Sequence, residues 1–359
     1  MMTVPYEKTM QETIEFQSNI LKGVKALMNM PRNEIKSDLL DKDEVLSIGK
    51  MKLYHYKPVP SKAKKVSVPL MITYALVNKQ YMMDIQPDRS VIKAFLEAGL
   101  DVYIIDWGYP TAEDKFMTMD DHINWYMDAC VDYIRKTTGH DKINLLGVCQ
   151  GGTFSTIYTA LHQDKVNALV TMVTPIDFSP NDALLFAWSK SMDGDALVDA
   201  YGVVPGDVMN VAYLLLKPFS LSLDKYIGLA TNKQIEDPEF LTNFLRMEKW
   251  IFDSPGQEGE TLRQFINDLY KDNKLIKGEL ELGGKRVDLK NLTCPLFAIC
   301  AEYDHLVPLS ASKPLLDAVG SQDKTFTSFP VGHIGMYVSS RSQKEIAPQI
   351  GQWLASKSK

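Results

Sequence analysis

Residues 142–154 read KINLLGVCQGGTF, and this stretch decides the fold that the rest of the chain is expected to adopt. A short apolar run leads into a glycine-rich turn, and the residues that follow, TFSTIYTALH, have the pattern of a helix. The sequence therefore predicts a strand, a sharp turn and a helix, with Cys149 at the apex of the turn. Gly147 and Gly151 stand two residues to either side of the cysteine, where they leave room for the helix to pass close to the strand.

The cysteine at this apex is predicted to be a nucleophile. The pattern G-x-C-x-G is that of the nucleophile elbow, G-x-S-x-G, with cysteine in place of serine. The following helix points its first N–H groups and its positive dipole end at the thiol, which favours the thiolate. A cysteine after an apolar strand is usually an inert, small hydrophobic residue. The flanking glycines favour the catalytic interpretation of Cys149.

The composition of the chain excludes several classes of function. It has 359 residues with 45 acidic and 39 basic side chains, and it has no basic cluster that would indicate binding to nucleic acid. Glu7 and Glu12 interrupt the stretch in which a signal peptide would be apolar, and no apolar run is long enough to cross a membrane. We therefore expect a cytoplasmic protein without a transmembrane segment. Four cysteines without paired C-x-x-C spacing favour reduced thiols and no metal site.

The pattern of apolar residues predicts an α/β fold. Strands alternate with helices from residue 68 onward, which indicates a mostly parallel central sheet with helices on both faces. An edge hairpin is expected before this alternation, at residues 45–56. The predicted strands of the sheet are residues 68–76, 101–107, 143–148, 166–173, 296–300 and 324–330, and the predicted helices include residues 90–98, 118–138 and 153–162.

Three regions are expected along the chain. Residues 1–44 form an N-terminal helical segment, and its apolar residues at helical spacing are expected to lie on the catalytic domain, with a partner or an apolar surface as the alternative. Residues 45–177 and 288–359 form the catalytic core. Between them, residues 178–287 lack convincing strands and indicate a helical cap over the nucleophile. Residues 211–223 within the cap are expected to be core, with contact to an apolar ligand as the alternative.

Two further residues complete a predicted catalytic triad with Cys149. Asp304 lies in the loop after the strand 296–300, and His333 lies between glycines after the strand 324–330. The chain order of nucleophile, acid and histidine is that of α/β-hydrolases, and ligands gather at the carboxyl ends of strands in such sheets. His333 is predicted to take the proton of Cys149 and pass it to a leaving group, while Asp304 holds its tautomer.

An oxyanion hole is expected beside the nucleophile. The backbone N–H of Gln150, directly after Cys149, and that of Val77, in the loop after the first core strand, together provide two donors for the oxygen of a tetrahedral intermediate. Asn78 and His305 adjoin positions of the predicted site and are expected to surround it without taking part in the chemistry.

Sulfur in place of oxygen favours acyl transfer over hydrolysis. A thiolate that attacks a thioester forms another thioester at nearly the same free energy, so the acyl group stays activated for the next acceptor. This chemistry points to an acyl donor such as a coenzyme A thioester and to transfer onto an alcohol. Coenzyme A thioester is then the substrate, and no separate cofactor is expected.

Five segments of the chain resemble one known family. They are GVCQGGT at 147–153, YALVNKQYMMDIQPDRS at 74–90, DVYIIDWGYP at 101–110, AEYDHLVP at 301–308 and PVGHIGMYV at 330–338. Together they look like the catalytic subunit of polyhydroxyalkanoate synthases, whose lipase-like box carries cysteine. The short chain is similar to the class III enzymes, with class IV as the alternative.

The resemblance implies a reaction and a setting. Cys149 would carry the acyl chain, with Asp304 and His333 as the triad partners, and (R)-3-hydroxyacyl-CoA with a short chain, such as 3-hydroxybutyryl-CoA, would be polymerised with release of coenzyme A. The resemblance also implies a second, non-homologous subunit, a homodimer or larger complex, and association with polyester granules in the cytoplasm.

Two other functions fit parts of the sequence. A Cys-His-Asp hydrolase resembling dienelactone hydrolase, which acts on esters or lactones, shares the elbow, but the large insertion at 178–287 argues against it. A granule-surface protein with a vestigial triad is the non-catalytic alternative. Polymer formed from 3-hydroxybutyryl-CoA would distinguish a synthase from both.

Overall fold

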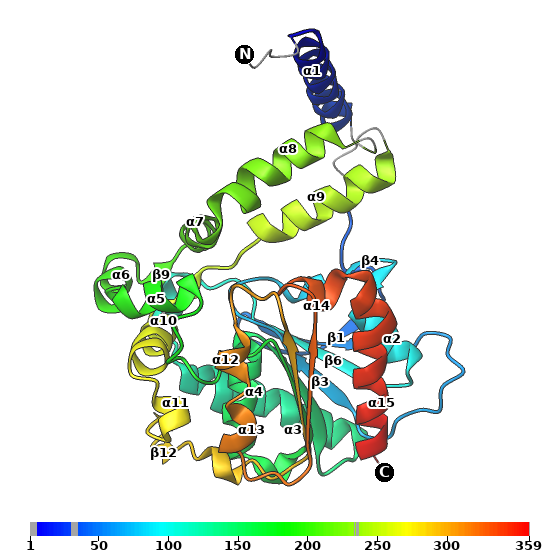
Figure 1. Ribbon diagram of the computed structural model, residues 1–359. Helices are drawn as coiled ribbons and strands as arrows, with labels where there is room; N and C mark the ends of the chain where they lie inside the picture. The colour runs from blue at the N-terminus through cyan, green and yellow to red at the C-terminus, as the bar shows by residue number, and fades with distance from the viewer. Residues whose placement is uncertain (1–5, 30–34, 233, 235–236, 359) are drawn as a thin grey trace.

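The computed structural model describes residues 6–29, 35–232, 234 and 237–358, and a sheet lies at its centre (Figure 1). Within these residues the sheet has eight strands in the order β1-β2-β6-β3-β7-β8-β13-β14. Neighbouring strands from β6 to β14 are parallel, whereas β2 is antiparallel to both β1 and β6. The strands are β1 (Lys42–Ile48), β2 (Met51–Tyr56), β3 (Leu70–Thr73), β6 (Val102–Asp106), β7 (Ile143–Val148), β8 (Val166–Met172), β13 (Leu296–Ala301) and β14 (Lys324–Phe329).

Helices cover both faces of the sheet, as the alternating pattern predicts (Figure 1). Side chains of α3 and α4 pack in one hydrophobic cluster, and those of α2 and α15 pack in a second cluster on the opposite face. The predicted fold class is therefore confirmed, and the expected edge hairpin is β1 with β2. The covering helices are α2 (Val91–Glu97), α3 (Asp128–Thr138), α4 (Gln150–Leu161) and α15 (Ala347–Lys357).

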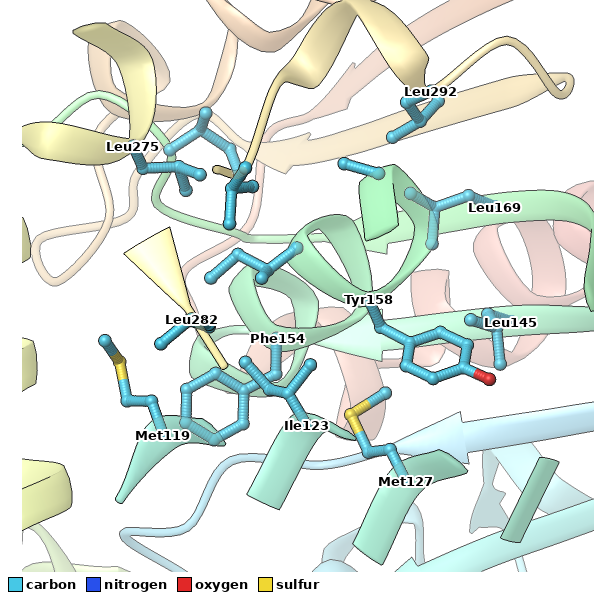
Figure 2. Close-up of a cluster of buried hydrophobic side chains, with 14 of the residues drawn as sticks. Met119, Ile123, Met127, Leu145, Phe154, Tyr158, Leu169, Leu275, Leu282 and Leu292 are labelled. Atoms are coloured by element: carbon cyan, nitrogen blue, oxygen red, sulfur yellow. The ribbon is translucent and has the colours of Figure 1, made fainter. Parts of the chain in front are cut away.

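The central strand β7 is buried on both sides. Leu145 belongs to the cluster of α3 and α4, whereas Leu146 and Val148 belong to the opposite cluster, and all three are fully buried. A parallel strand in this position needs apolar side chains at successive positions, which explains the continuous apolar run in the sequence. Figure 2 shows the first cluster, in which Phe154 and Tyr158 of α4 lie with Leu145.

The region predicted as a cap is mainly helical. Two of its helices, α8 and α9, pack against each other and form an arm that extends beyond the sheet (Figure 1). The boundaries of a separate cap remain a prediction. The helices of this region are α5 (Leu184–Ser191), α6 (Gly194–Tyr201), α7 (Gly206–Leu216), α8 (Asp224–Thr231), α9 (Pro238–Phe252), α10 (Gly259–Gln264) and α11 (Lys274–Lys277).

This region differs from the expectation in three ways. The expectation that residues 211–223 are core is wrong, because Val211, Leu215 and Phe219 are exposed, at 57%, 52% and 69%. Four short strands occur where no strand was expected, because elements of two residues are too short to show an alternating pattern. They are β9 (Val203–Val204), which pairs with β10 (Gln257–Glu258), and β11 (Glu281–Leu282), which pairs with β12 (Lys285–Arg286). In addition, Leu275 and Leu282 are buried in the same cluster as Phe154 (Figure 2). The last part of the predicted cap therefore packs into the core.

The N-terminal helix is present but does not lie on the catalytic core. α1 (Tyr6–Asn29) projects from the body and contacts α8 (Figure 1). The expected packing on the catalytic domain is wrong, because helical spacing of apolar residues does not reveal which surface covers them. Its exposed apolar side chains include Tyr6, Met10, Ile14 and Leu21. Met30 and the side chains of Val24 and Met28 lie outside the described residues. In the described parts of the chain, no helix has both the length and the apolar character needed to span a bilayer.

Candidate active site

Cys149 lies at a strained turn between β7 and α4. Its backbone has φ 54° and ψ −123°, a conformation that residues other than glycine rarely adopt. Its N–H donates to the carbonyl oxygen of Met172 at 2.9 Å, which extends the pairing of β7 with β8 by one residue. The helix α4 begins directly afterwards, at Gln150 instead of the predicted Thr153. The first N–H groups of the helix therefore lie beside the cysteine.

Close packing requires the glycines around Cys149. A Cβ atom at Gly147 would lie 2.4 Å from the Cα of Gly152, and one at Gly151 would lie 2.2 Å from the carbonyl oxygen of Thr73 on β3. Neither approach is compatible with a side chain. The helix α4 therefore passes β7 and β3 at a distance that only glycine permits, and this packing fixes the turn that presents Cys149.

Asp304 and His333 form a buried hydrogen-bonded pair at the carboxyl ends of the last two strands. Asp304 follows β13 and His333 follows β14, and His333 Nδ1 lies 2.6 Å from Asp304 Oδ2. The other carboxylate oxygen, Oδ1, accepts the backbone N–H groups of Leu306 at 2.8 Å and Val307 at 2.9 Å. The carboxylate is therefore held at both oxygens and aims at one nitrogen of the imidazole.

Cys149 interacts electrostatically with the same imidazole. Burial lowers the pKa of His333, but the Asp304 carboxylate and Cys149 outweigh burial and raise it to about 10. The imidazolium form is therefore stabilised by a carboxylate on one side and by the sulfur on the other. The structure brings together the three residues that the sequence singles out, although their catalytic roles remain a prediction.

The other three cysteines have a different environment. All four thiols are free of disulfides; Cys149 and Cys294 are partly exposed, and Cys130 and Cys300 are buried. Burial raises the pKa of Cys294 to about 12 and that of Cys300 to about 11, and it also raises the pKa of Cys130. These thiols stay protonated and unreactive near neutral pH. Among the described residues, no cluster of three or more metal-binding side chains occurs.

The two predicted oxyanion donors come from neighbouring elements. Gln150 is the first residue of α4, where backbone N–H groups have no partner within the helix. Its side-chain oxygen accepts the N–H of Leu76 at 3.1 Å, which ties the loop after β3 to the elbow. Val77 is the next residue of that loop. The assignment of its N–H to an oxyanion hole remains a prediction.

The two residues expected around the site contact different parts of the cap region. Asn78 donates its side-chain amide to the hydroxyl of Ser254, 2.8 Å away, in the segment after α9. His305 adjoins Asp304, and its pKa is lowered by burial and by the positive charge of Lys217 at the end of α7. Neither observation tests a role in the reaction.

Four tyrosines that the sequence analysis missed interact electrostatically with Cys149. Burial raises their pKa values, and the sulfur raises them further, so their hydroxyls stay protonated. The ring of Tyr337 meets the ring of Tyr74 edge-on at 6.0 Å and that of His333 edge-on at 6.2 Å. A buried tyrosine is indistinguishable from an ordinary core residue in a sequence, so no signal revealed them. The four are Tyr74, Tyr213, Tyr270 and Tyr337.

The fold and the site define an α/β-hydrolase. A general model of the alpha/beta hydrolase fold matches residues 75–340. Among solved structures, an esterase from Thermogutta terrifontis is similar at 13% identity and a TM-score of 0.51, covering 89% of this chain and 100% of that one. A monoacylglycerol lipase from Paleococcus ferrophilus is similar at 15% identity and a TM-score of 0.50, covering 82% and 97%. These two structures support the fold alone.

Curated relatives define the family more closely. The chain is 50% identical to the poly(3-hydroxyalkanoate) polymerase subunit PhaC of Allochromatium vinosum, over 97% of either chain. It is 49% identical to the same subunit of Thiocystis violacea, over 98% of either chain, and 45% identical to that of Synechocystis, over 98% of this chain and 94% of that one. The chain therefore belongs to the family of poly(3-hydroxyalkanoate) polymerase PhaC subunits. The resemblance drawn from the sequence is confirmed, and so is the expectation of an enzyme.

Proposed function

We propose that this chain polymerises short-chain (R)-3-hydroxyacyl-CoA into polyhydroxyalkanoate, with the growing acyl chain carried on Cys149. One observation carries the proposal. A partly exposed cysteine at a nucleophile elbow interacts electrostatically with a histidine that is held by a buried aspartate, in a chain that is 50% identical to a named polymerase subunit. No cofactor takes part, because the coenzyme A thioester is the substrate.

The first step loads the enzyme. His333 already carries a proton near neutral pH, because its pKa is raised to about 10, and the thiolate of Cys149 attacks the thioester carbonyl. The N–H groups of Gln150 and Val77 bind the oxygen of the tetrahedral intermediate. The bond between the carbonyl carbon and the sulfur of coenzyme A breaks, and His333 gives its proton to the leaving thiolate. The products are acyl-Cys149 and free coenzyme A.

The second step extends the chain. The 3-hydroxyl of an incoming unit gives its proton to His333, and its oxygen attacks the thioester carbonyl on Cys149. An ester bond forms, the bond to sulfur breaks, and the Cys149 thiolate is regenerated beside the imidazolium. The contacts of Asp304 favour His333 as the base, because both oxygens of Asp304 already accept hydrogen bonds.

Transfer to a hydroxyl rather than to water needs a site from which water is excluded. His333 is buried, with 6% of its surface exposed. Tyr213 brings a phenol from α7 close enough to interact with Cys149. These side chains are proposed to limit the access of water to the thiol, so that chain growth is favoured over hydrolysis.

The chain is also proposed to work in an assembly. Its relatives are each named as a polymerase subunit, which supports a second, non-homologous subunit and a homodimer or larger complex. An apolar polyester product supports work at the surface of granules in the cytoplasm.

Incubation with 3-hydroxybutyryl-CoA tests the proposed function. The expected result is release of coenzyme A with insoluble polyester, and the loss of both in Cys149→Ala at unchanged unfolding midpoint. Free 3-hydroxybutyrate in place of polymer would identify a hydrolase. An inert thioester would favour a non-catalytic protein.

A further inference from the structure

The loop after β3, residues 74–79, is fixed to the core on one side. Leu76 N–H donates to the side chain of Gln150, and the indole N–H of Trp107 donates to the carbonyl oxygen of Tyr74 at 2.9 Å. These contacts hold the first half of the loop against the elbow. Val77, whose N–H is the second proposed oxyanion donor, follows directly.

The other side of the same loop is held by the segment that leaves α9, residues 250–257. The indole N–H of Trp250 donates to the carbonyl oxygen of Lys79 at 2.7 Å. The side-chain amide of Gln257 donates to the carbonyl oxygen of Leu76 at 3.3 Å. Asn78 donates to Ser254 at 2.8 Å. The residues on both sides of Val77 are therefore bonded to one segment of the predicted cap.

Asp253 fixes that segment to two further core loops. Its carboxylate accepts the hydroxyl of Tyr81 at 2.8 Å and the hydroxyl of Tyr109 at 2.6 Å. Tyr81 lies in the turn (Gln80–Met83) directly after the oxyanion loop, and Tyr109 lies after β6. Burial and the charge of Asp253 raise the pKa of both tyrosines, so both hydroxyls stay protonated and donate.

We propose that Asp253 is a positioning residue, which acts through Tyr81 and Tyr109 to hold the loop of Val77 at the distance that an oxyanion hole requires. The proposal rests on the proposed function. The arm of α8 and α9 then has a role in positioning the oxyanion loop. Its exit segment sets the position of an oxyanion donor, so a displaced arm leaves the nucleophile intact and the oxyanion unbound.

Such a role predicts a specific kinetic effect. The oxyanion exists only in the transition state and the intermediate, so loss of its positioning lowers kcat and leaves KM nearly unchanged. Alkylation of Cys149 by iodoacetamide is a displacement at saturated carbon and forms no oxyanion. It reports on the thiolate, and a change confined to the loop does not slow it.

The test compares Tyr81→Phe/Tyr109→Phe with wild type in release of coenzyme A from 3-hydroxybutyryl-CoA. We expect kcat to fall about tenfold to a hundredfold, with KM within about twofold and an unchanged rate of alkylation. In the same assay, Asp253→Ala is expected to show the full loss, and Asp253→Asn to recover part of it, because an amide oxygen still accepts one hydroxyl.

Tyr226→Phe is the matched control for Tyr109→Phe. The hydroxyl of Tyr226 also donates to a carboxylate at 2.6 Å, that of Glu248, and the two tyrosines are similarly exposed, at 43% and 50%. Tyr226 and Glu248 join α8 to α9, and the described hydroxyl contact of Tyr226 does not involve the loop, so kcat should not change.

Two results would overturn the proposal while the proposed function stands. One is a wild-type kcat in Tyr81→Phe/Tyr109→Phe. The other is alkylation slowed as much as coenzyme A release, which would indicate general disorder of the site. A wild-type enzyme that releases no coenzyme A would overturn both the function and the positioning role.

Discussion

His333 Nδ1 lies 2.6 Å from Asp304 Oδ2, although the two residues stand at the ends of different strands, β13 and β14. The parallel pairing of these strands, with Ala301 opposite Phe329, brings the two loops together. Because both oxygens of Asp304 are already engaged, its contribution is to hold the imidazole and to stabilise its charged form.

Replacement of the aspartate in Asp304→Asn therefore tests the pair. An amide keeps the shape of the side chain but loses the charge, so the pKa of His333 should fall and its tautomer should no longer be fixed. We expect kcat for coenzyme A release to fall about ten-thousandfold. The pH dependence of coenzyme A release checks the cause, because it should follow an imidazole that loses its proton at lower pH than in wild type. A variant with a wild-type pH profile would contradict the role given to Asp304.

The raised pKa of His333 also predicts a pH dependence of stability. A folded-state pKa of about 10 against an ordinary value of about 6.5 means that the native state holds a proton that the unfolded state has lost. This contribution to the free energy of unfolding is complete below about pH 6.5 and is lost as the pH rises towards 10. Denaturant unfolding at a series of pH values, for wild type and His333→Gln, measures it.

The difference in unfolding free energy between wild type and His333→Gln should shrink across this window. Since Cys149 contributes to the raised pKa of His333, Cys149→Ala should move the upper end of the window to lower pH. A difference that stays constant from about pH 6.5 to 10 would show that the imidazole is not held as a cation.

Gly152 tests the packing that makes the elbow. A methyl group there would lie 1.9 Å from the side-chain oxygen of Thr174, so Gly152→Ala should destabilise the fold by about 2–3 kcal/mol. Gly228→Ala is the control, because a methyl group at that position meets nothing within 4 Å. Unfolding midpoints in denaturant compare the two. Equal midpoints would mean that α4 does not pass the end of β8 as closely as described.

Lys50 is predicted to hold a buried carboxylate where β10 meets the core. Its Nζ lies 3.2 Å from Glu258, which is almost fully buried and which also lies 3.5 Å from His122. Lys50→Met leaves a buried charge without this cation, so the free energy of unfolding should fall by about 3–5 kcal/mol. Lys52→Met in the same hairpin breaks an exposed pair with Glu44 and should have little effect. Similar unfolding midpoints for both variants would contradict the buried pair.

The sequence reveals the framework and the triad because both leave local signals. The apolar run before Gly147 and the glycines around Cys149 mark the end of one strand. Apolar strands directly before Asp304 and His333 place these two residues at the ends of two more. Parallel pairing then brings the three strand ends to one edge of the sheet. The four tyrosines around the sulfur leave no such signal. Their positions depend on how elements such as α7 and α14 (Gly335–Val338) pack over the edge, which no local pattern encodes.

Contacts between distant segments are also beyond the sequence. Asp253 meets Tyr81 and Tyr109 across separations of 172 and 144 residues, and an aspartate after a helix is indistinguishable from an ordinary surface residue. The predicted position of α1 is wrong for a related reason. The spacing of its apolar residues predicts that one face of the helix packs against another surface. Which surface that is depends on the path of the chain between the helix and the core, which only the structure shows.

The central claim is that the acyl chain is carried on the sulfur of Cys149. Wild-type enzyme should be mixed briefly with labelled 3-hydroxybutyryl-CoA, quenched in acid and digested, and the label located by mass spectrometry. The account predicts a thioester on the peptide that contains Cys149, with Cys130, Cys294 and Cys300 unlabelled. Polymer formed with the label on another residue, or with no acylated Cys149 at any time before the first turnover is complete, would contradict it.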